Sequence, residues 1–158
     1  MIVYLSLGAN LGNREQTIDR ALELLSEQIG PLIKRSSFYY SEPWGFESPN
    51  EFCNICASFD THLSPLDLLQ ATQAIERQLG RKKKTQSDIY EDRAIDIDII
   101  RAFDDDGKEI HVHTFRSFSE GDKNCQLSTV NYLIVPHQKM AQRPFVTVPL
   151  NEIMQENA

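Results

Sequence analysis

The stretch Arg93-Ala94-Ile95-Asp96-Ile97-Asp98-Ile99-Ile100 alternates isoleucine with aspartate. On a β-strand, this period of two places Asp96 and Asp98 on one face, about 6–7 Å apart, and the isoleucines on the other. Two carboxylates this close repel each other by about 3 kcal/mol at an effective dielectric of about 20. Mg²⁺ between them would remove the repulsion and complete its shell with water and phosphate oxygens. The pair therefore predicts a phosphate-transfer site; the alternative is a half-exposed strand with solvated aspartates.

Length and composition indicate one globular domain. The chain has 158 residues, of which 41% are apolar and 25% charged, so residues 1–158 can build a single core, with a polar insert at about 104–130. Three cysteines and no charged-then-apolar leader predict a cytoplasmic location. No apolar run approaches the roughly 18 residues of a membrane span. The net charge of −7 argues against nucleic acid as a partner.

The order of elements predicts the fold class. Two helices are expected, one capped by Asn13 and ended by Gly30, the other capped by Ser64 and ended by Gly80. They alternate with strands to give β-α-β-β-α-β, the order of a ferredoxin-like α+β sandwich. Its antiparallel sheet carries the helices on one face and leaves the other open for a ligand. The expected strands are 2–7, 33–40, 51–61 and the aspartate strand.

The C-terminal third is less regular. Asp105-Asp106-Gly107 resembles a hairpin turn, which makes 109–114 its return strand. Residues 116–129 show no periodic pattern and are interpreted as a mobile loop. Residues 130–136 and 145–149 are expected to be extra extended stretches.

A basic run, Gly80-Arg81-Lys82-Lys83-Lys84-Thr85, precedes the aspartate strand by one loop. A solvated surface is the usual interpretation of such a run. Beside two carboxylates, however, a polyphosphate explains both features, because its free oxygens need cations. Arg93 and Arg143 are assigned to the same cluster. The run lacks the glycine spacing and preceding strand of a P-loop.

Two further motifs favour structural interpretations. Cys53-Asn54-Ile55-Cys56 has redox or zinc spacing, but residues three apart on a strand face opposite sides, and no second such motif completes four ligands. His111-Val112-His113 places two imidazoles on one strand face, which is more typical of a solvated face than of a metal site.

Six short motifs, in order, resemble the 6-hydroxymethyl-7,8-dihydropterin pyrophosphokinase family of folate biosynthesis. The resemblance covers nearly the whole chain except about residues 104–130. The motifs are Gly8-Ala9-Asn10-Leu11-Gly12; Ser37-Phe38-Tyr39 leading to Glu42-Pro43-Trp44-Gly45; Phe52-Cys53-Asn54; Ile75-Glu76 with Gly80-Arg81; Arg93 with Asp96-Ile97-Asp98-Ile99; and Pro136-His137 with Arg143-Pro144-Phe145.

The resemblance implies a monomer that transfers the pyrophosphate of ATP to the hydroxymethyl oxygen of a reduced pterin, with two magnesium ions bridging the phosphates. Asp96 and Asp98 would hold both ions. The residues expected to meet the triphosphate are Arg81, Lys83, Arg93, His137 and Arg143, of which Arg81, Arg93 and Arg143 would stabilise the charge in transfer.

The same resemblance assigns the two substrate ends. Gln73, Glu76, Ile99 and Thr129 would line the nucleotide. The pterin would lie between the rings of Phe52 and Phe145, while Asn54 and the backbone near Ser41, Pro43 and Trp44 contact its edge.

The chain departs from the family pattern before Arg93, where Tyr90, Glu91 and Asp92 replace a common tryptophan, glycine and proline. Phe52 stands where tyrosine is frequent. Two other functions remain as alternatives: a ferredoxin-like module that binds RNA or a small regulatory ligand, and a magnesium-dependent phosphohydrolase. The acidic charge and the absence of an aromatic RNA-binding pattern oppose the RNA module.

Overall fold

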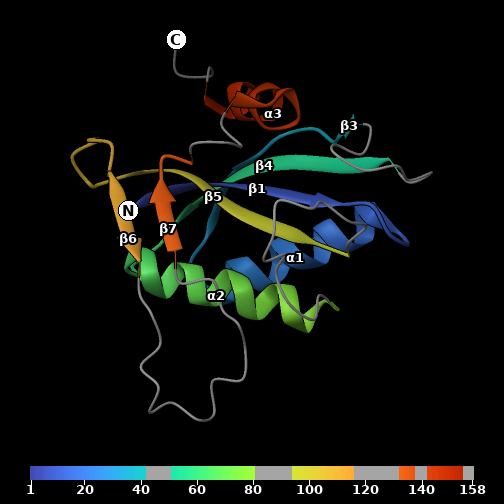
Figure 1. The fold of residues 1–158 in the computed structure, drawn as a ribbon, viewed down its shortest axis with the longest axis horizontal. Helices are drawn as coiled ribbons and strands as arrows, with labels where there is room; N and C mark the ends of the chain where they lie inside the picture. The colour runs from blue at the N-terminus through green and yellow to red at the C-terminus, as the bar shows by residue number, and fades with distance from the viewer. Residues whose placement is uncertain (42–50, 81–93, 116–131, 138–141, 155–158) are drawn as a thin grey trace.

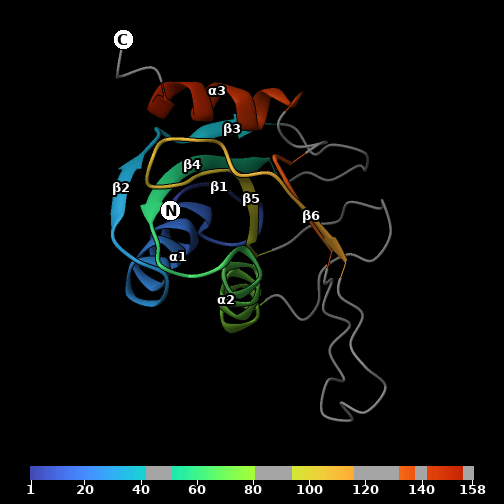
Figure 2. The same cartoon turned by 90° about the vertical axis from the view of Figure 1, so that its left-hand side faces the viewer.

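The computed structural model describes residues 1–41, 51–80, 94–115, 132–137 and 142–154. These residues form three layers, with a sheet between helices on both sides (Figures 1 and 2). Helices α1 (Arg14–Gln28) and α2 (Pro65–Gln78) lie on one face, and α3 (Pro144–Met154) lies on the other.

The main sheet is antiparallel and has the order β2-β4-β1-β5, with β3 also pairing with β4. This arrangement confirms the predicted ferredoxin-like fold. Two further strands form a separate antiparallel pair beside α2. The strands are β1 (Ile2–Ala9), β2 (Leu32–Arg35), β3 (Tyr39–Ser41), β4 (Phe52–Asp60), β5 (Asp96–Phe103), β6 (Val112–Phe115) and β7 (Tyr132–Val135).

Local sequence signals start both predicted helices. Asn13 caps α1 by accepting a hydrogen bond from the Gln16 backbone N–H at 3.2 Å. Ser64 caps α2 through the Asp67 N–H, also at 3.2 Å, and Pro65 occupies the first turn, where a missing N–H costs nothing. Both helices therefore begin where the sequence predicts.

Two apolar clusters fill the spaces between the layers. The larger lies between the sheet and helices α1 and α2, and it includes Ile55, Ile97 and Phe59. The smaller lies under α3 and joins Cys56 and Ile100 of the sheet to Val146, Leu150 and Ile153 of the helix. The sheet is thus buried on both faces over much of its area.

A β-bulge in β5 changes which side chains face α3. The pairing with β1 shifts register between Tyr4 and Leu5, which are opposite Arg101 and Ile99. One extra residue therefore enters β5, and Ile100 packs in the cluster under α3. Arg101 also reaches α3, with Nη1 3.6 Å from the sulfur of Met154. The bulge follows the two aspartates directly.

The expectation that 145–149 is extended is wrong, because these residues belong to α3. The backbone carbonyl of Arg143 accepts hydrogen bonds from the N–H groups of Val146 and Thr147, so Pro144 sits in the first turn. Helix α3 packs on the face that was expected to be open, and Glu152 accepts hydrogen bonds from the N–H and the hydroxyl of Ser37. Helix α3 therefore covers part of the sheet face that was expected to be open for a ligand.

Two other predicted strands differ in detail. The predicted strand 33–40 is divided into β2 and β3, and between them Ser36 bonds to Cys56 through both its backbone N–H and its hydroxyl. The return strand expected at 109–114 makes one isolated bridge with β5, from Glu109 to Phe103. Its later residues pair instead with β7.

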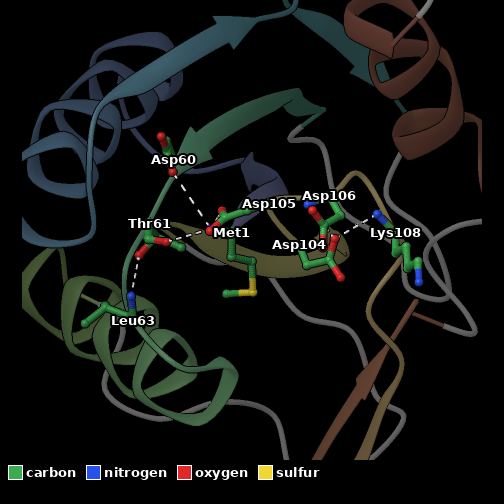
Figure 3. Close-up of polar contacts among 8 residues, drawn as sticks. All are labelled: Met1, Asp60, Thr61, Leu63, Asp104, Asp105, Asp106 and Lys108. Carbon is green, nitrogen blue, oxygen red and sulfur yellow. Dashed lines mark hydrogen bonds and ion pairs between the residues drawn. The ribbon is translucent and has the colours of Figure 1, made fainter.

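The turn after β5 folds as predicted and lies against the first residue of the chain (Figure 3). The Asp104 carboxylate accepts hydrogen bonds from the backbone N–H groups of Asp106 and Lys108, each at 2.9 Å. The amino group of Met1 donates to the Thr61 carbonyl at 3.1 Å and to Asp105 at 3.4 Å. These contacts hold the ends of β1, β4 and β5 together.

Within the described ranges, no helix combines the length and apolarity that crossing a membrane requires.

Candidate active site

The aspartates of β5 lie on the predicted face. Ile95, Ile97 and Ile99 are at most 5% exposed and belong to the cluster against α1 and α2. Asp96 and Asp98 alternate with them, are half-buried, and face the other side of the sheet. The predicted alternation is therefore confirmed, while the choice between a metal site and a half-exposed strand with solvated aspartates stays open at this point.

Strand register aligns the metal and pterin candidates. Gly8 of β1 pairs with Asn54 of β4 on one side and with Asp96 of β5 on the other. Directly opposite residues of antiparallel strands face the same side. Asn54 and Asp96 therefore lie in one cross-strand row, separated by two strand spacings, or about 10 Å. Ser6 forms the next row with Cys56 and Asp98.

Gly8 leaves room for Asn54 in the centre of the first row. A Cβ atom at Gly8 would stand 2.6 Å from Oδ1 of Asn54, which is too close for the amide to keep its position. Asn54 itself is 3% exposed, and its Nδ2 donates to the hydroxyl oxygen of Ser41 at 2.9 Å. The structure thus brings together Asn54 and Ser41, two of the residues predicted to contact the pterin.

The predicted aromatic pair comes from two different layers. Phe52 begins β4, two residues before Asn54, and its ring edge would lie 3.9 Å from a Cβ at Gly8. Phe145 is the second residue of α3 and packs against the cluster under that helix. Both rings are half-buried. Pro43 and Trp44 lie outside the described residues.

The nucleotide candidates on α2 are buried against β5. Gln73 is 5% exposed and Glu76 is 2% exposed. An Oε2 atom of Glu76 accepts the backbone N–H of Ile97 at 2.8 Å. Because Ile97 stands between Asp96 and Asp98, this bond fixes the aspartate strand at the edge of the sheet. The side chain of Ile99 faces the core.

The last two described candidates, His137 and Arg143, lie between β7 and α3 in the chain. The backbone N–H of His137 donates to the Ile100 carbonyl at 2.9 Å, just after the cis peptide bond between Val135 and Pro136. The guanidinium carbon of Arg143 lies 6.0 Å from the ring centre of Phe145. Both side chains are half-buried. The predicted residues Arg81, Lys83, Arg93 and Thr129 lie outside the described residues.

An open hollow of about 450 Å³ adjoins His137. Its lining includes His111, His113 and Gln142, together with apolar residues of β6 and β7. Both histidines were expected on a solvated strand face, and both are exposed. Sequence reasoning missed the spacing role of Gly8, because glycine has no side chain whose chemistry would indicate it.

The two described cysteines have no common site. Cys53 packs in the larger cluster and Cys56 in the smaller one, so they face opposite sides of β4. Both are free thiols. Among the residues that the structure describes, no group of three or more His, Cys, Asp or Glu side chains could hold a metal ion. The structural interpretation of Cys53 and Cys56 is therefore favoured.

These cysteines should react slowly in the folded protein. Burial raises the pKa of Cys53 to about 11 and that of Cys56 to about 12, so both remain protonated near pH 8. We expect iodoacetamide to label them slowly at that pH and quickly after unfolding in guanidinium chloride. Peptide mass spectrometry measures both rates. Fast labelling of either cysteine in the native protein would contradict its described burial.

Comparison with known proteins identifies the family. Residues 4–155 match the family model for 7,8-dihydro-6-hydroxymethylpterin-pyrophosphokinase (HPPK). A 2-amino-4-hydroxy-6-hydroxymethyldihydropteridine pyrophosphokinase of Porphyromonas gingivalis is 41% identical over 152 residues, which cover 96% of this chain and 90% of that protein. The Bacillus subtilis protein of the same name is 33% identical over 156 residues, covering 98% and 79%.

Solved structures show the same fold at lower sequence identity. The Plasmodium falciparum HPPK-DHPS triple mutant superposes with a TM-score of 0.67 and 16% identity, covering 95% of this chain. An HPPK-DHPS in complex with substrates gives a TM-score of 0.65 and 15% identity. This chain spans 40% of each of those two longer chains.

The fold and the family match define an ATP-dependent diphosphotransferase. The chain belongs to the HPPK family, and it transfers pyrophosphate from ATP to hydroxymethyldihydropterin in folate biosynthesis.

The register around Gly8 yields a specific prediction. Gly8→Ala should displace the Asn54 amide. If this amide bonds the pterin, as the sequence predicts, the KM for the pterin should rise about tenfold, since misaligning one hydrogen bond costs about 1.4 kcal/mol, and the KM for ATP should stay unchanged. Steady-state kinetics with each substrate varied measures this split.

A double-mutant cycle shows whether Gly8→Ala changes the KM for the pterin through Asn54. If Gly8→Ala acts through Asn54, it should cost little in an Asn54→Ala background. Equal costs in both backgrounds would show that Gly8 acts in another way.

Proposed function

We propose that Asp96 and Asp98 form the magnesium site on which pyrophosphate transfer depends. Two half-buried carboxylates on one face of β5 supply the hard oxygen ligands that Mg²⁺ prefers, and the remaining ligands would be water and ATP phosphate oxygens. We propose two ions, both held by this pair. Magnesium held by these residues would neutralise charge on the triphosphate, which would be its chemical contribution to this reaction.

The pterin is proposed to bind over β4, at the other end of the Gly8 row. The flat ring would stack between Phe52 and Phe145, and the Asn54 amide would hydrogen-bond its edge, with Ser41 and the backbone of Pro43 and Trp44 completing the contacts. The single observation that carries this proposal is the row itself. About 10 Å between Asn54 and Asp96 is enough for a pterin edge at one end and a phosphate at the other.

ATP is proposed to bind along the outer side of β5. The nucleotide end would be lined by Gln73, Glu76, Ile99 and Thr129. The cationic side chains would surround the triphosphate. Support comes from the hydrogen bond of Glu76 to Ile97, between the two aspartates, and from that of His137 to Ile100, two residues after Asp98. The proposed triphosphate contacts are Arg81, Lys83, Arg93, His137 and Arg143.

The proposed transfer is a direct displacement at the β-phosphorus of ATP. The pterin hydroxymethyl oxygen forms a bond to this phosphorus while the bond to the oxygen bridging the α- and β-phosphates breaks. AMP leaves with that oxygen, and the hydroxyl proton passes to solvent. The transition state is loose, so alignment and charge stabilisation by Arg81, Arg93 and Arg143 matter more than a strong base.

Product analysis tests the proposed site together with its chemistry. The wild-type protein with ATP, magnesium and the pterin should form AMP and the pterin diphosphate, and omitting the pterin should stop AMP formation. Asn54→Ala should raise the KM for the pterin without changing that for ATP. Release of ADP or phosphate without pterin would support a hydrolase and contradict this account.

We also propose that the protein acts as a monomer on small molecules, in the cytoplasm and without nucleic acid. The charge of −7 supports the last point, and the free thiols of Cys53 and Cys56 suit a reducing compartment. Light scattering after gel filtration should give the monomer mass of 18.1 kDa. Twice that mass at micromolar concentration would refute the proposed monomer.

A further inference from the structure

The first turn of α1 contacts both strands that flank residues 42–50. Arg14 donates from Nη1 to the backbone carbonyl of Glu51 at 2.8 Å, immediately before β4. Glu15 accepts the hydroxyl of Tyr40, in β3, at 3.2 Å. Two consecutive helix residues thus contact the end of β3 and the residue that precedes β4.

Arg14 links these two contacts. Its guanidinium carbon lies 5.2 Å from the ring centre of Tyr40, and Nη2 lies 3.7 Å from the Glu15 carboxylate. A single cation therefore packs on β3 through the Tyr40 ring and bonds to the start of β4 through the Glu51 carbonyl. The position of the turn is itself fixed by the Asn13 cap.

Each contact is one residue away from a proposed pterin contact. Tyr40 precedes Ser41, and Glu51 precedes Phe52. Ser41 and Phe52 are directly paired across β3 and β4, and the amide of Asn54 bonds to Ser41. A shift of either strand end would therefore move the ring and the hydroxyl away from each other.

We infer that Arg14 is a positioning residue for the pterin, because it aligns the strand ends that carry Ser41 and Phe52 without touching the substrate. The inference rests on the proposed pterin site. Arg14 is about one quarter exposed, and its ion pair with Glu15 is accompanied by the contacts with Tyr40 and Glu51. Exposed ion pairs add little stability, so removing this bridge should affect binding more than folding.

The test compares Arg14→Met with Arg20→Met on the same helix. Arg20 makes an exposed ion pair with Glu23 at 2.9 Å and contacts neither strand end, which makes it a matched control. We expect Arg14→Met to weaken pterin binding about tenfold and to raise the pterin KM equally, with the ATP KM and kcat nearly unchanged. Arg20→Met should change none of these values.

Two more variants distinguish positioning from a general loss of structure. Arg14→Lys keeps the charge but loses the planar group on Tyr40, so it should restore affinity only in part. Tyr40→Phe removes the hydroxyl contact with Glu15 and should weaken pterin binding less than Arg14→Met does. If Arg14→Met lowers the melting temperature strongly, Tyr40→Phe still tests the inference.

The possible outcomes distinguish a failure of this inference from a failure of the proposed pterin site. Calorimetric titration with the pterin would overturn the inference if Arg14→Met and Tyr40→Phe bind as tightly as wild type while Asn54→Ala binds weakly. It would also be overturned if Arg14→Met weakened pterin and ATP equally. If Asn54→Ala also binds the pterin as tightly as wild type, the result contradicts the proposed pterin site itself.

Discussion

Asp98→Asn should lower kcat for AMP formation by on the order of 10³ or more and leave the protein folded, and Asp96→Asn should do the same. An amide cannot replace the charge of a carboxylate facing a cation, and a loss of about 4 kcal/mol in transition-state stabilisation corresponds to a factor of about 10³. The fold should persist, because asparagine has the same shape and relieves the repulsion between neighbouring carboxylates. Single-turnover assays and urea unfolding measure the two effects separately.

Asp106→Asn is the matched control for this pair. Asp106 is exposed, and its hydrogen bond to Asp104 uses the backbone N–H, which the substitution keeps. Its kcat should equal that of the wild type. Turnover within tenfold of the wild type in both Asp96→Asn and Asp98→Asn would show that these carboxylates do not hold the catalytic magnesium.

Among the glycines that the structure describes, Gly30 should be the one whose replacement by alanine destabilises the protein most. Gly30 has a φ of +144°, and a Cβ atom there would lie 1.9 Å from the Asp60 carbonyl oxygen and 2.9 Å from its carbon. Both obstacles are backbone atoms of β4, so relief requires the strand or the end of α1 to move. We expect the free energy of unfolding to fall by about 3–5 kcal/mol and the melting temperature by about 10 °C.

Gly107→Ala is a control that separates the steric clash at Gly30 from the backbone strain of a positive φ. Gly107 also has a positive φ, +81°, but a Cβ there would meet nothing within 4 Å. Its cost should be about 1 kcal/mol, from strain alone. Equal melting temperatures for the two variants would contradict the described contact between Gly30 and Asp60.

The main sheet and helices α1 and α2 could be predicted because their local signals agree with their packing. The alternation of Ile95 to Ile99 specifies both faces of β5, and the Asn13 and Ser64 caps mark where the helices begin. Hydrophobic period and capping are short-range properties, so a single sequence contains them.

Helix α3 was missed because its local signals conflict. Pro144, Pro149 and the β-branched Val146, Thr147 and Val148 favour extended backbone. The helical spacing of Val146, Leu150 and Ile153 becomes decisive only when Cys56 and Ile100 provide an apolar surface to pack against. Tertiary burial therefore overrides propensity in this segment.

The residue types indicate a chemistry for the proposed site, but they do not indicate its geometry. Asp96, Asp98 and Asn54 have side chains whose chemistry suggests roles, whereas their common row depends on Gly8 and on strand register. Register between distant strands follows from the whole sheet and cannot be deduced from one segment. The link from Arg14 to Glu51 spans 37 residues and has the same origin. The roles of all the proposed site residues stay predictions.

The most direct test of the central claim is calorimetric titration of a non-hydrolysable ATP analogue with and without magnesium. If Asp96 and Asp98 hold magnesium against the triphosphate, the wild-type protein should bind the analogue tightly only when magnesium is present. The double variant Asp96→Asn/Asp98→Asn should lose this dependence while its circular dichroism stays that of the folded protein. Equal affinity with and without magnesium, or full magnesium dependence in the double variant, would contradict the account.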